Sequence, residues 1–189
     1  MKEETDFGGP TSLKENIIRL IKRYDIVKEY SAPVRLSSGN HADVYIDLKK
    51  AAGIPVLFEY ITALASKRLC KSENEQLIGI ELFGAIYAHS IAGKSGMYCC
   101  SLKKKQNKYR KDKILEGYLP EHITSKNIIL VDGVLTTGRP IINGLEKLDE
   151  LEYSVKKAFV IFDKQEGGRE ELESRGISLE SLFAKEELV

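Results

Sequence analysis

Apolar residues recur at helical spacing near the start of the chain, and short extended stretches follow. Ser12 and Glu15 form a capping box ahead of the first apolar pattern, which predicts a helix over residues 12–24. Two strand-like pieces around a polar turn are expected within residues 34–49. A second helical pattern, with proline near its start, covers residues 55–69.

The rest of the chain alternates between short apolar runs and helical patterns. We expect strands at 77–81, 97–102, 114–119, 127–131 and 155–163, and helices at 85–92 and 140–151. Strands that alternate with helices are typical of βαβ units, in which helices cover both faces of a parallel sheet. The pattern therefore predicts a single α/β domain over residues 1–189, with a doubly wound, mainly parallel sheet flanked by helices. The N-terminal helix and strands, at about 12–50, form a small appendage over a core sheet at about 51–175.

Composition restricts the class of protein. The 189 residues carry a formal net charge of +1, with 42% hydrophobic and 30% charged residues, as in ordinary soluble globular proteins. This balance argues against a uniformly basic nucleic-acid binder. Within residues 103–113 (KKKQNKYRKDK), however, seven basic residues and one acid give a local charge of +6, which leaves −5 for the rest. This basic segment calls for a functional explanation.

The cysteines and the N-terminus indicate a compartment. Cys70, Cys99 and Cys100 form neither a disulfide framework nor a C-x-x-C metal site, so we expect reduced core residues in a reducing compartment. The polar first ten residues contain no apolar stretch typical of a secretory signal, and no run of the chain is long enough for a membrane span. A cytoplasmic protein without a membrane segment is expected.

The most informative loop follows the strand at 127–131 and reads DGVLTTGRP, residues 132–140. Ligands of open α/β sheets bind at the carboxyl ends of the strands. Backbone N–H groups at the start of a helix suit a phosphate, Thr136 and Thr137 add hydroxyl donors, and Asp132 is suited to accept hydrogen bonds from sugar hydroxyls. An ordinary strand-to-helix turn capped by threonine has the same local pattern, so the loop alone leaves both interpretations open.

The sequence resembles a known family at this loop and in four further segments. ILVDGVLTTG is similar to the phosphoribosyl-pyrophosphate (PRPP) signature of type I phosphoribosyltransferases. Segments similar to motifs of the orotate phosphoribosyltransferases occur in the family's order: LSSG and VYID at 36–39 and 44–47, GIELFGAI at 79–86, Glu116-Gly117, and DKQEGG at 163–168. Several linked motifs are more specific than any one of them.

The resemblance implies a type I phosphoribosyltransferase fold with an N-terminal hood, and a reaction. Orotate attacks C1′ of PRPP, giving orotidine 5′-monophosphate and pyrophosphate in de novo pyrimidine (UMP) biosynthesis. It further implies Mg²⁺ held mainly by PRPP, with no metal ligand assigned to the chain, and a homodimer with shared active sites. The substrates are small molecules, and neither nucleic acid nor membrane is an expected partner.

The resemblance also assigns the site residues. PRPP contacts fall on Glu81, Gly84, Lys103, Lys104, Lys108, Tyr109, Asp132, Gly133, Val134, Leu135, Thr136, Thr137, Gly138, Arg139 and Pro140, and orotate contacts on Tyr45, Thr136 and Lys164. Lys104 and Asp132 are expected to be catalytic. Such a reaction depends on positioning and on electrostatic stabilisation of the leaving pyrophosphate, and a lysine-rich segment that closes over the phosphates also excludes water.

Several positions depart from the family's pattern. Gly133 replaces the second of two paired acids, Asn107 and Tyr109 replace basic residues of the mobile loop, and Lys164 replaces an arginine that contacts orotate. Lysine lacks the bidentate recognition that arginine gives to planar groups. Two alternatives therefore stay open: a catalytically weak paralogue that binds PRPP or a nucleotide in a regulatory role, and a phosphoribosyltransferase for another base.

Overall fold

The computed structural model describes residues 12–35, 41–69, 75–104, 114–120 and 127–188. Its elements in chain order are α1 (Leu13–Arg23), β1 (Val27–Arg35), β2 (His41–Ile46), α2 (Leu48–Ala52), α3 (Pro55–Leu69), β3 (Gln76–Ile80), α4 (Phe83–Ser95), β4 (Cys99–Leu102), β5 (Leu115–Tyr118), β6 (Ile128–Leu135), α5 (Arg139–Asp149), β7 (Lys157–Asp163), α6 (Gly168–Ser174), β8 (Ser178–Ala184) and the 3₁₀ turn η2 (Lys185–Glu187). Among these residues no helix has the length and apolar character needed to cross a bilayer.

The central sheet has six strands in the order β5-β4-β3-β6-β7-β8. All neighbours are parallel except β4 and β5, which pair antiparallel at one edge. From β3 the chain proceeds outward through β4 and β5, and it then returns to place β6, β7 and β8 on the other side of β3. The strand order therefore reverses between β3 and β6, which is where open α/β sheets bind their ligands.

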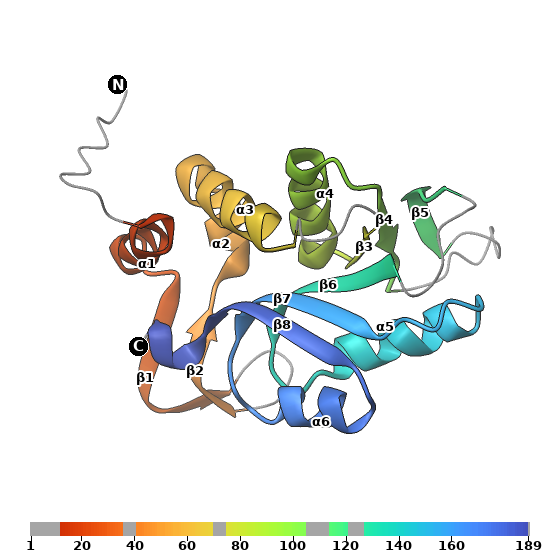
Figure 1. Ribbon diagram of the computed structural model, residues 1–189. Helices are drawn as coiled ribbons and strands as arrows, with labels where there is room; N and C mark the ends of the chain where they lie inside the picture. Colours follow the sequence, from red (N-terminus) through yellow and green to blue (C-terminus); the bar gives the residue numbers. More distant parts are fainter. Residues whose placement is uncertain (1–11, 36–40, 70–74, 105–113, 121–126, 189) are drawn as a thin grey trace.

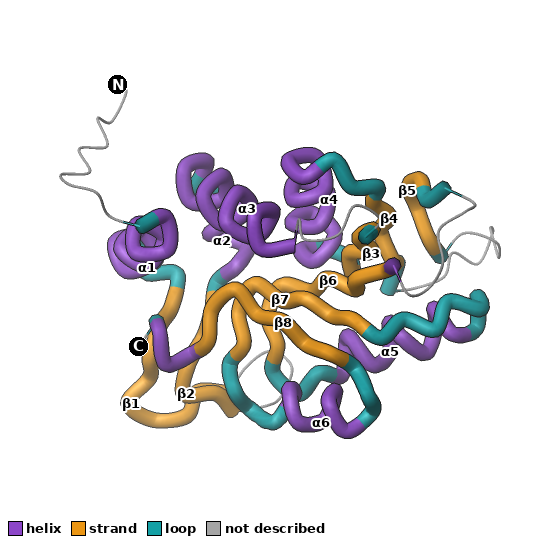
Figure 2. The backbone as a smooth tube through the Cα atoms, viewed as in Figure 1, coloured by secondary structure: helices purple, strands orange, loops and turns teal. Residues whose placement is uncertain are grey.

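Helices cover both faces of the sheet, so the predicted doubly wound, mainly parallel α/β architecture is confirmed (Figures 1 and 2). Successive side chains of a strand point to opposite faces. Ile129 and Val131 of β6 accordingly belong to the apolar cluster on the side of α1, α3 and α4, whereas Ile128 and Leu130 belong to the cluster on the side of α5 and α6. Burial on both faces explains why the first half of β6, residues 128–131, is uninterrupted apolar.

The N-terminal segment forms a separate two-stranded antiparallel sheet beside the core. The capping box of Ser12 and Glu15 is present at the start of α1. β1 and β2 pair from Val27 opposite Ile46 to Arg35 opposite His41, with an irregularity between Glu29 and Val34. The hairpin was predicted within residues 34–49, but its first strand begins at Val27. The predicted turn at 37–40 lies outside the described residues.

Two further differences concern the loops that carry the candidate site. β6 does not end at Val131 but continues to Leu135, because β7 remains alongside it as far as the pair Leu135–Asp163. The loop before α5 is therefore only Thr136–Gly138, and Asp132 lies within the strand. The short helices α2 and α6 were not predicted, since each has too few residues for a clear periodic pattern. The edge strand β8 was not predicted either, and its polar residues Ser178, Glu180 and Ser181 interrupt its apolar sequence.

Candidate active site

The predicted site residues gather at the carboxyl ends of the parallel strands. Glu81 and Gly84 follow β3, Lys103 and Lys104 follow β4, and Asp132 lies near the end of β6. The backbone N–H of Glu81 donates to Leu102 O at 3.0 Å, which ties the end of β3 to the end of β4. These loops surround the point between β3 and β6 where the strand order reverses.

Two glycines let the loops approach one another closely. A Cβ atom on Gly84 would lie 2.6 Å from Val131 O and 3.0 Å from Asp132 Cα, so the loop after β3 rests directly on β6. A Cβ on Gly168 would lie 2.4 Å from Thr136 O and 2.8 Å from Gly138 N. The turn after β6 thus packs directly against the start of α6. No larger residue fits either position without backbone movement.

Asp132 is a shielded carboxylate that, within the described part of the chain, accepts a hydrogen bond from its own neighbour. Its Oδ1 accepts a hydrogen bond from the backbone N–H of Gly133 at 2.8 Å. Burial raises the pKa of Asp132 to about 6, while the Gly133 hydrogen bond and the positive charge of Lys104 act in the opposite direction. A carboxylate with spare acceptor capacity beside a cation is suited to bind hydroxyl groups of a ligand.

A cavity of about 330 Å³ lies between the strand ends and α5. Four basic side chains line it, those of Lys103, Lys104, Arg139 and Lys147, and none of the lining residues is acidic. The Lys103 ammonium forms an ion pair with Glu116 of β5. Lys104 is exposed and forms no ion pair within the described part of the chain, so its charge is available to an anion.

The turn between β6 and α5 presents an uncapped helix start. Gly138 adopts φ 77° as the N-cap residue, and no side chain caps the helix. Thr136 is half-buried, whereas Thr137 and Arg139 are exposed and line a groove of about 680 Å³ between α5 and α6. Pro140, in the first turn, has no N–H to offer, so phosphate binding relies on the other backbone N–H groups.

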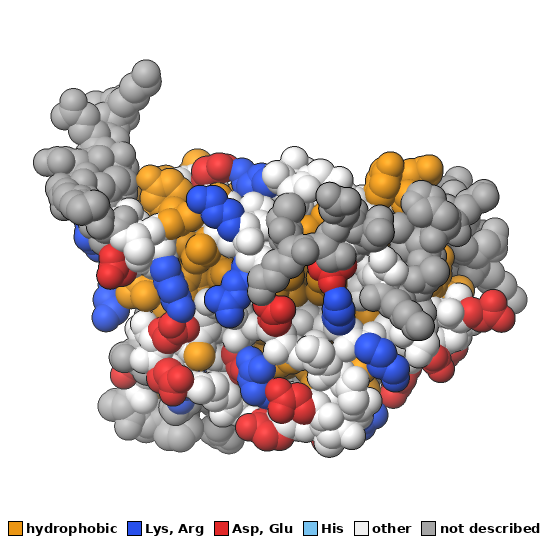
Figure 3. All heavy atoms as spheres, in the orientation of Figure 1, with side chains coloured by type: hydrophobic (Ala, Val, Ile, Leu, Met, Phe, Trp, Pro, Cys, Tyr) orange, Lys and Arg blue, Asp and Glu red, His pale blue; other side chains and the backbone are white. Residues whose placement is uncertain are grey.

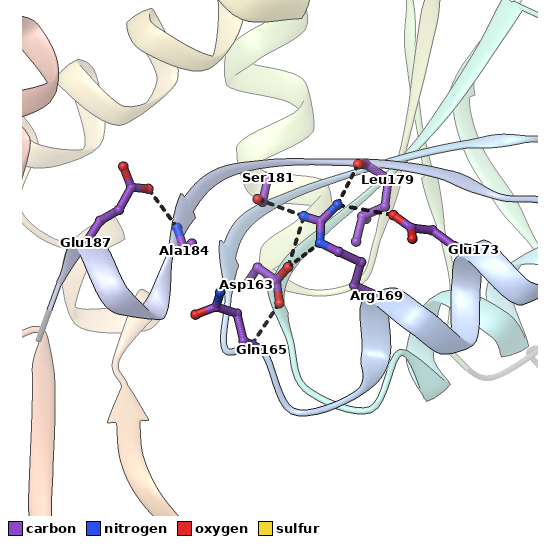
Figure 4. A network of polar contacts seen from close by, with 8 residues as sticks. All are labelled: Asp163, Gln165, Arg169, Glu173, Leu179, Ser181, Ala184 and Glu187. Carbon is purple, nitrogen blue, oxygen red and sulfur yellow. Dashed lines mark hydrogen bonds and ion pairs between the residues drawn. The ribbon is translucent and has the colours of Figure 1, made fainter.

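Asp163, the last residue of β7, and the adjacent Lys164 have different partners. Asp163 accepts hydrogen bonds from Arg169 Nε at 3.0 Å and from the backbone N–H of Gln165 at 2.9 Å. Figure 4 shows Arg169 of α6 reaching between Asp163 and β8, where it also binds Leu179 O and the hydroxyl of Ser181. Lys164 is buried, and its Nζ lies 2.6 Å from Glu166 Oε1.

The space next to Gly133 is occupied by a side chain from the N-terminal segment. A Cβ at Gly133 would lie 2.4 Å from Leu48 Cδ2. Leu48 begins α2, and its carbonyl accepts a hydrogen bond from Tyr87 OH at 3.4 Å. The position where the resemblance implies a second acid is therefore occupied by the end of a flexible apolar side chain, which would have to turn away to admit one.

The remaining predicted contact residues lie in several environments. Val134 is half-buried and Leu135 is buried, and the carbonyl of Leu135 accepts a hydrogen bond from Lys164 N at 3.0 Å. Tyr45 lies on β2, where burial and the carboxylate of Asp47 raise the pKa of its hydroxyl. Lys108 and Tyr109 lie outside the described residues.

Comparisons with known proteins identify the family. Orotate phosphoribosyltransferase of Methanococcus maripaludis is 31% identical over 179 residues, which cover 94% of this chain and 94% of that protein. The chain belongs to the orotate phosphoribosyltransferase family. No family model matches the chain.

Solved structures agree with this family assignment. The crystal structure of orotate phosphoribosyltransferase from Aeropyrum pernix covers 91% of this chain and 96% of its own, with a TM-score of 0.72 and 25% identity. The Mycobacterium tuberculosis enzyme in complex with PRPP has a TM-score of 0.72 at 19% identity, with 94% of this chain and 99% of that chain covered, and supports the fold. The predicted family and fold are thus confirmed.

Within this family assignment, three residues matter that the motifs did not indicate. Leu48 closes the space at Gly133, Arg169 satisfies Asp163, and Lys147 donates hydrogen bonds to backbone carbonyls at the end of β4. Each contact joins residues that are far apart along the chain or lie on separate elements, so no local sequence pattern predicts it.

The face of the molecule in Figure 3 carries basic and acidic side chains interspersed, without a broad patch of one sign.

Proposed function

We propose that this chain transfers the phosphoribosyl group of PRPP to orotate, forming orotidine 5′-monophosphate and pyrophosphate in de novo pyrimidine biosynthesis. The observation that carries the proposal is the arrangement at the strand reversal. Asp132, with free acceptor capacity, lies against Gly84 and within the electrostatic reach of Lys104. A ribose with anionic groups at both ends matches this combination of a carboxylate, a cation and an uncapped helix start.

In the proposed step a bond forms between N1 of orotate and C1′ of the ribose, the bond from C1′ to the pyrophosphate oxygen breaks, and the N1 proton is released to the departing pyrophosphate. Positive charge develops on the ribose and negative charge on the leaving group. Asp132 accepts hydrogen bonds from the ribose hydroxyls, and Lys104 stabilises the departing pyrophosphate beside the Glu81–Gly84 loop. The backbone of Thr136–Arg139 holds the 5′-phosphate and so fixes C1′ for attack.

The proposal includes Mg²⁺ bound chiefly through the pyrophosphate of PRPP. The described residues contain no group of three or more His, Cys, Asp or Glu side chains arranged to hold a metal ion. The few carboxylates in this part of the site, Glu81 and Asp132, fit a hard cation that arrives with its phosphate ligands. When bound, the ion neutralises charge on the leaving pyrophosphate. The protein residues then position the substrate around it.

The base end of the site is assigned to Tyr45, Thr136 and Lys164. The buried Lys164 ammonium is paired with Glu166, so an orotate carboxylate has to share this cation with a protein carboxylate. A phosphoribosyltransferase for another base is the alternative that this ion pair favours.

A homodimer with shared active sites and a cytoplasmic location complete the proposal. Large apolar side chains are exposed along this side of the sheet, with Leu82 (60% exposed) directly after β3, and Tyr98 (46%) and Tyr118 (63%) at the amino end of β4, away from the candidate site. Tyr98 and Tyr118 form an edge-to-face pair, with ring centroids 5.4 Å apart. Exposed apolar patches commonly mark protein interfaces. The free thiols of Cys99 and Cys100 fit a reducing compartment.

One experiment tests the reaction and its alternatives. Purified protein is mixed with PRPP, Mg²⁺ and orotate, and the loss of orotate absorbance is followed, with hypoxanthine, adenine and uracil in parallel reactions. Turnover with orotate alone supports the proposal. Turnover with another base assigns a different substrate, and tight PRPP binding in calorimetry without turnover on any base establishes the regulatory paralogue. The filling of the Gly133 position by Leu48 is the observation that favours this last outcome.

A further inference from the structure

A lysine on α5 is bonded to the backbone at the point where β4 ends. Lys147 Nζ donates hydrogen bonds to the carbonyl oxygens of Lys103, at 3.1 Å, and of Lys104, at 2.7 Å. These two residues directly follow Leu102, the last residue of β4. Hydrogen bonds from an ammonium group are shorter and stronger than those between neutral groups. A single side chain therefore holds two successive peptide groups.

The close packing of α5 against the sheet explains how Lys147 reaches this point. Gly144 lies one turn earlier on the same helix face, and a Cβ there would be 3.1 Å from Leu130 Cδ2 and 3.2 Å from Leu102 Cδ2. A glycine in a helix interior costs about 1 kcal/mol relative to alanine, so its occurrence here is explained by this close approach. The helix thus passes over the end of β4 and carries Lys147 to the following carbonyl groups.

The other contacts at this point hold Lys103 more firmly than Lys104. The Lys103 N–H donates to Ile114 O at 2.9 Å, and the Lys103 ammonium pairs with Glu116. Both contacts tie Lys103 to the antiparallel edge. Among the described residues, Lys147 supplies the side-chain hydrogen bond to the backbone of Lys104. The position of Lys104, whose positive charge acts on Asp132, therefore depends on α5 as well as on β4.

We propose that Lys147 is a positioning residue that fixes the backbone of Lys104, so that the Lys104 ammonium faces the pyrophosphate of the substrate. The inference rests on the proposed function, in which Lys104 contacts that group. Two of the three N–H donors of Lys147 are used on the carbonyl groups, which makes the side chain a tether. Fixing the cation before the substrate arrives removes an ordering cost from binding and from the transition state.

A set of variants separates positioning from a direct effect of charge. Lys147→Met removes both hydrogen bonds and keeps the length of the side chain, and Lys147→Arg retains a donor. We expect Lys147→Met to lower kcat/KM for PRPP about tenfold, which is the effect of losing one hydrogen bond to a charged group. Lys147→Arg should retain most of the wild-type kcat/KM. Lys94→Met, which removes an exposed ion pair with Glu59, is the matched control and leaves kcat/KM unchanged.

The decisive comparison uses Lys104→Met as a background. If Lys147 acts through Lys104, adding Lys147→Met to Lys104→Met changes kcat/KM by less than about twofold, because coupled residues are not additive. A full tenfold loss in that background would mean that Lys147 acts on the substrate directly, and the positioning role would be wrong.

Amide hydrogen exchange tests the tether without any turnover. In the protein without substrates, Lys147→Met should accelerate exchange in a peptide covering Cys100–Lys104, while Lys94→Met should not. Unchanged exchange in Lys147→Met would overturn the inference even if the enzyme is active. Absence of PRPP binding and turnover in the wild-type protein would instead overturn the proposed function, with the exchange result still deciding whether the tether exists.

Discussion

Two aspartates near the ends of neighbouring parallel strands have opposite surroundings. Asp163 of β7 is almost fully buried, and its carboxylate is bound by Arg169 and by the backbone N–H of Gln165. Asp132 of β6 has the hydrogen bond from Gly133 and a pKa raised by burial to about 6. The Asp163 carboxylate, paired with Arg169, stabilises the loop that carries α6, whereas the Asp132 carboxylate has acceptor capacity left for a ligand. A position near the carboxyl ends of the parallel strands is therefore not enough to make an aspartate functional.

The largest expected effect on stability comes from breaking the satisfied pair. Asp163→Asn removes the buried counter-charge of the Arg169 guanidinium, which among the described residues keeps only its longer ion pair with Glu173 at 3.5 Å, and the Arg169 side chain is 32% exposed. We expect the free energy of unfolding to fall by about 2–3 kcal/mol, less than for a fully buried pair because solvent screens the arginine. Urea unfolding measures this loss, with the exposed Asp149→Asn as the control.

If Asp163 has a structural role and Asp132 binds the ligand, kcat/KM of the folded Asp163→Asn protein should stay near that of the wild type. If the Asp163 variant lost activity at a temperature where it is fully folded, Asp163 would have a direct part in the site, and the division between the two aspartates would be wrong.

Asp132→Asn should instead lower activity and raise the free energy of unfolding. Loss of the charged acceptor for the ribose hydroxyls should lower kcat/KM for PRPP about 10- to 100-fold, as expected for one or two hydrogen bonds to a charged group. Unfolding at pH 7.5 should become more difficult by about 2 kcal/mol, because the variant no longer buries a carboxylate at a cost. Steady-state kinetics and urea unfolding on the same preparations test both directions. Unchanged kinetics would place the ribose elsewhere.

The raised pKa of Asp132 also gives opposite pH dependences for stability and binding. The folded state holds this proton more tightly than the unfolded state, so its contribution to stability falls as pH rises from about 3.8 to 6. PRPP binding needs the ionised form and should weaken about tenfold at pH 5 relative to pH 7.5. Calorimetric titration of PRPP measures this, and Asp132→Asn separates the protein's share from protonation of the substrate phosphates. If PRPP binding by Asp132→Asn had the same pH dependence as binding by the wild type, Asp132 would not be the group whose ionisation controls binding.

The fold was largely predictable because its determinants are local. The capping box at Ser12 and the uninterrupted apolar strand at 128–131 specify their elements within a few residues. The motif loops then follow from strand order, since parallel strands bring their carboxyl ends to one edge. The end of β6 was misplaced because the residues after Val131 are strand only through pairing with β7.

The contacts that distinguish one site residue from another were not predictable. Arg169 on Asp163, Leu48 beside Gly133 and Lys147 on the carbonyl groups after β4 all depend on packing between elements. The sequence shows that Gly133 lacks a carboxylate, but it does not show what fills the space. Similarly, Lys164 stands where the family has a cation, and its pairing with Glu166 is visible only in three dimensions.

The smallest effect concerns the position next to Asp132. Gly133→Asp would restore a second acid, but its Cβ would lie 2.4 Å from Leu48 Cδ2, so the side chain of Leu48 has to move. We expect the single variant to lose about 1–2 kcal/mol of stability through overpacking and to gain little PRPP affinity. Leu48→Val removes the obstructing methyl groups at a cost of about 1 kcal/mol by itself.

The double variant Gly133→Asp/Leu48→Val should be more stable than the sum of the two single effects by about 1 kcal/mol and should bind PRPP several-fold more tightly than Gly133→Asp alone. Urea unfolding and calorimetry on the four proteins of this cycle measure both quantities. Additive stabilities would show that Leu48 does not close the space beside Gly133. Coupled stabilities without a gain in affinity would show that the site works with Asp132 as its single acid, which makes the contrast between Asp132 and its structural counterpart Asp163 sharper still.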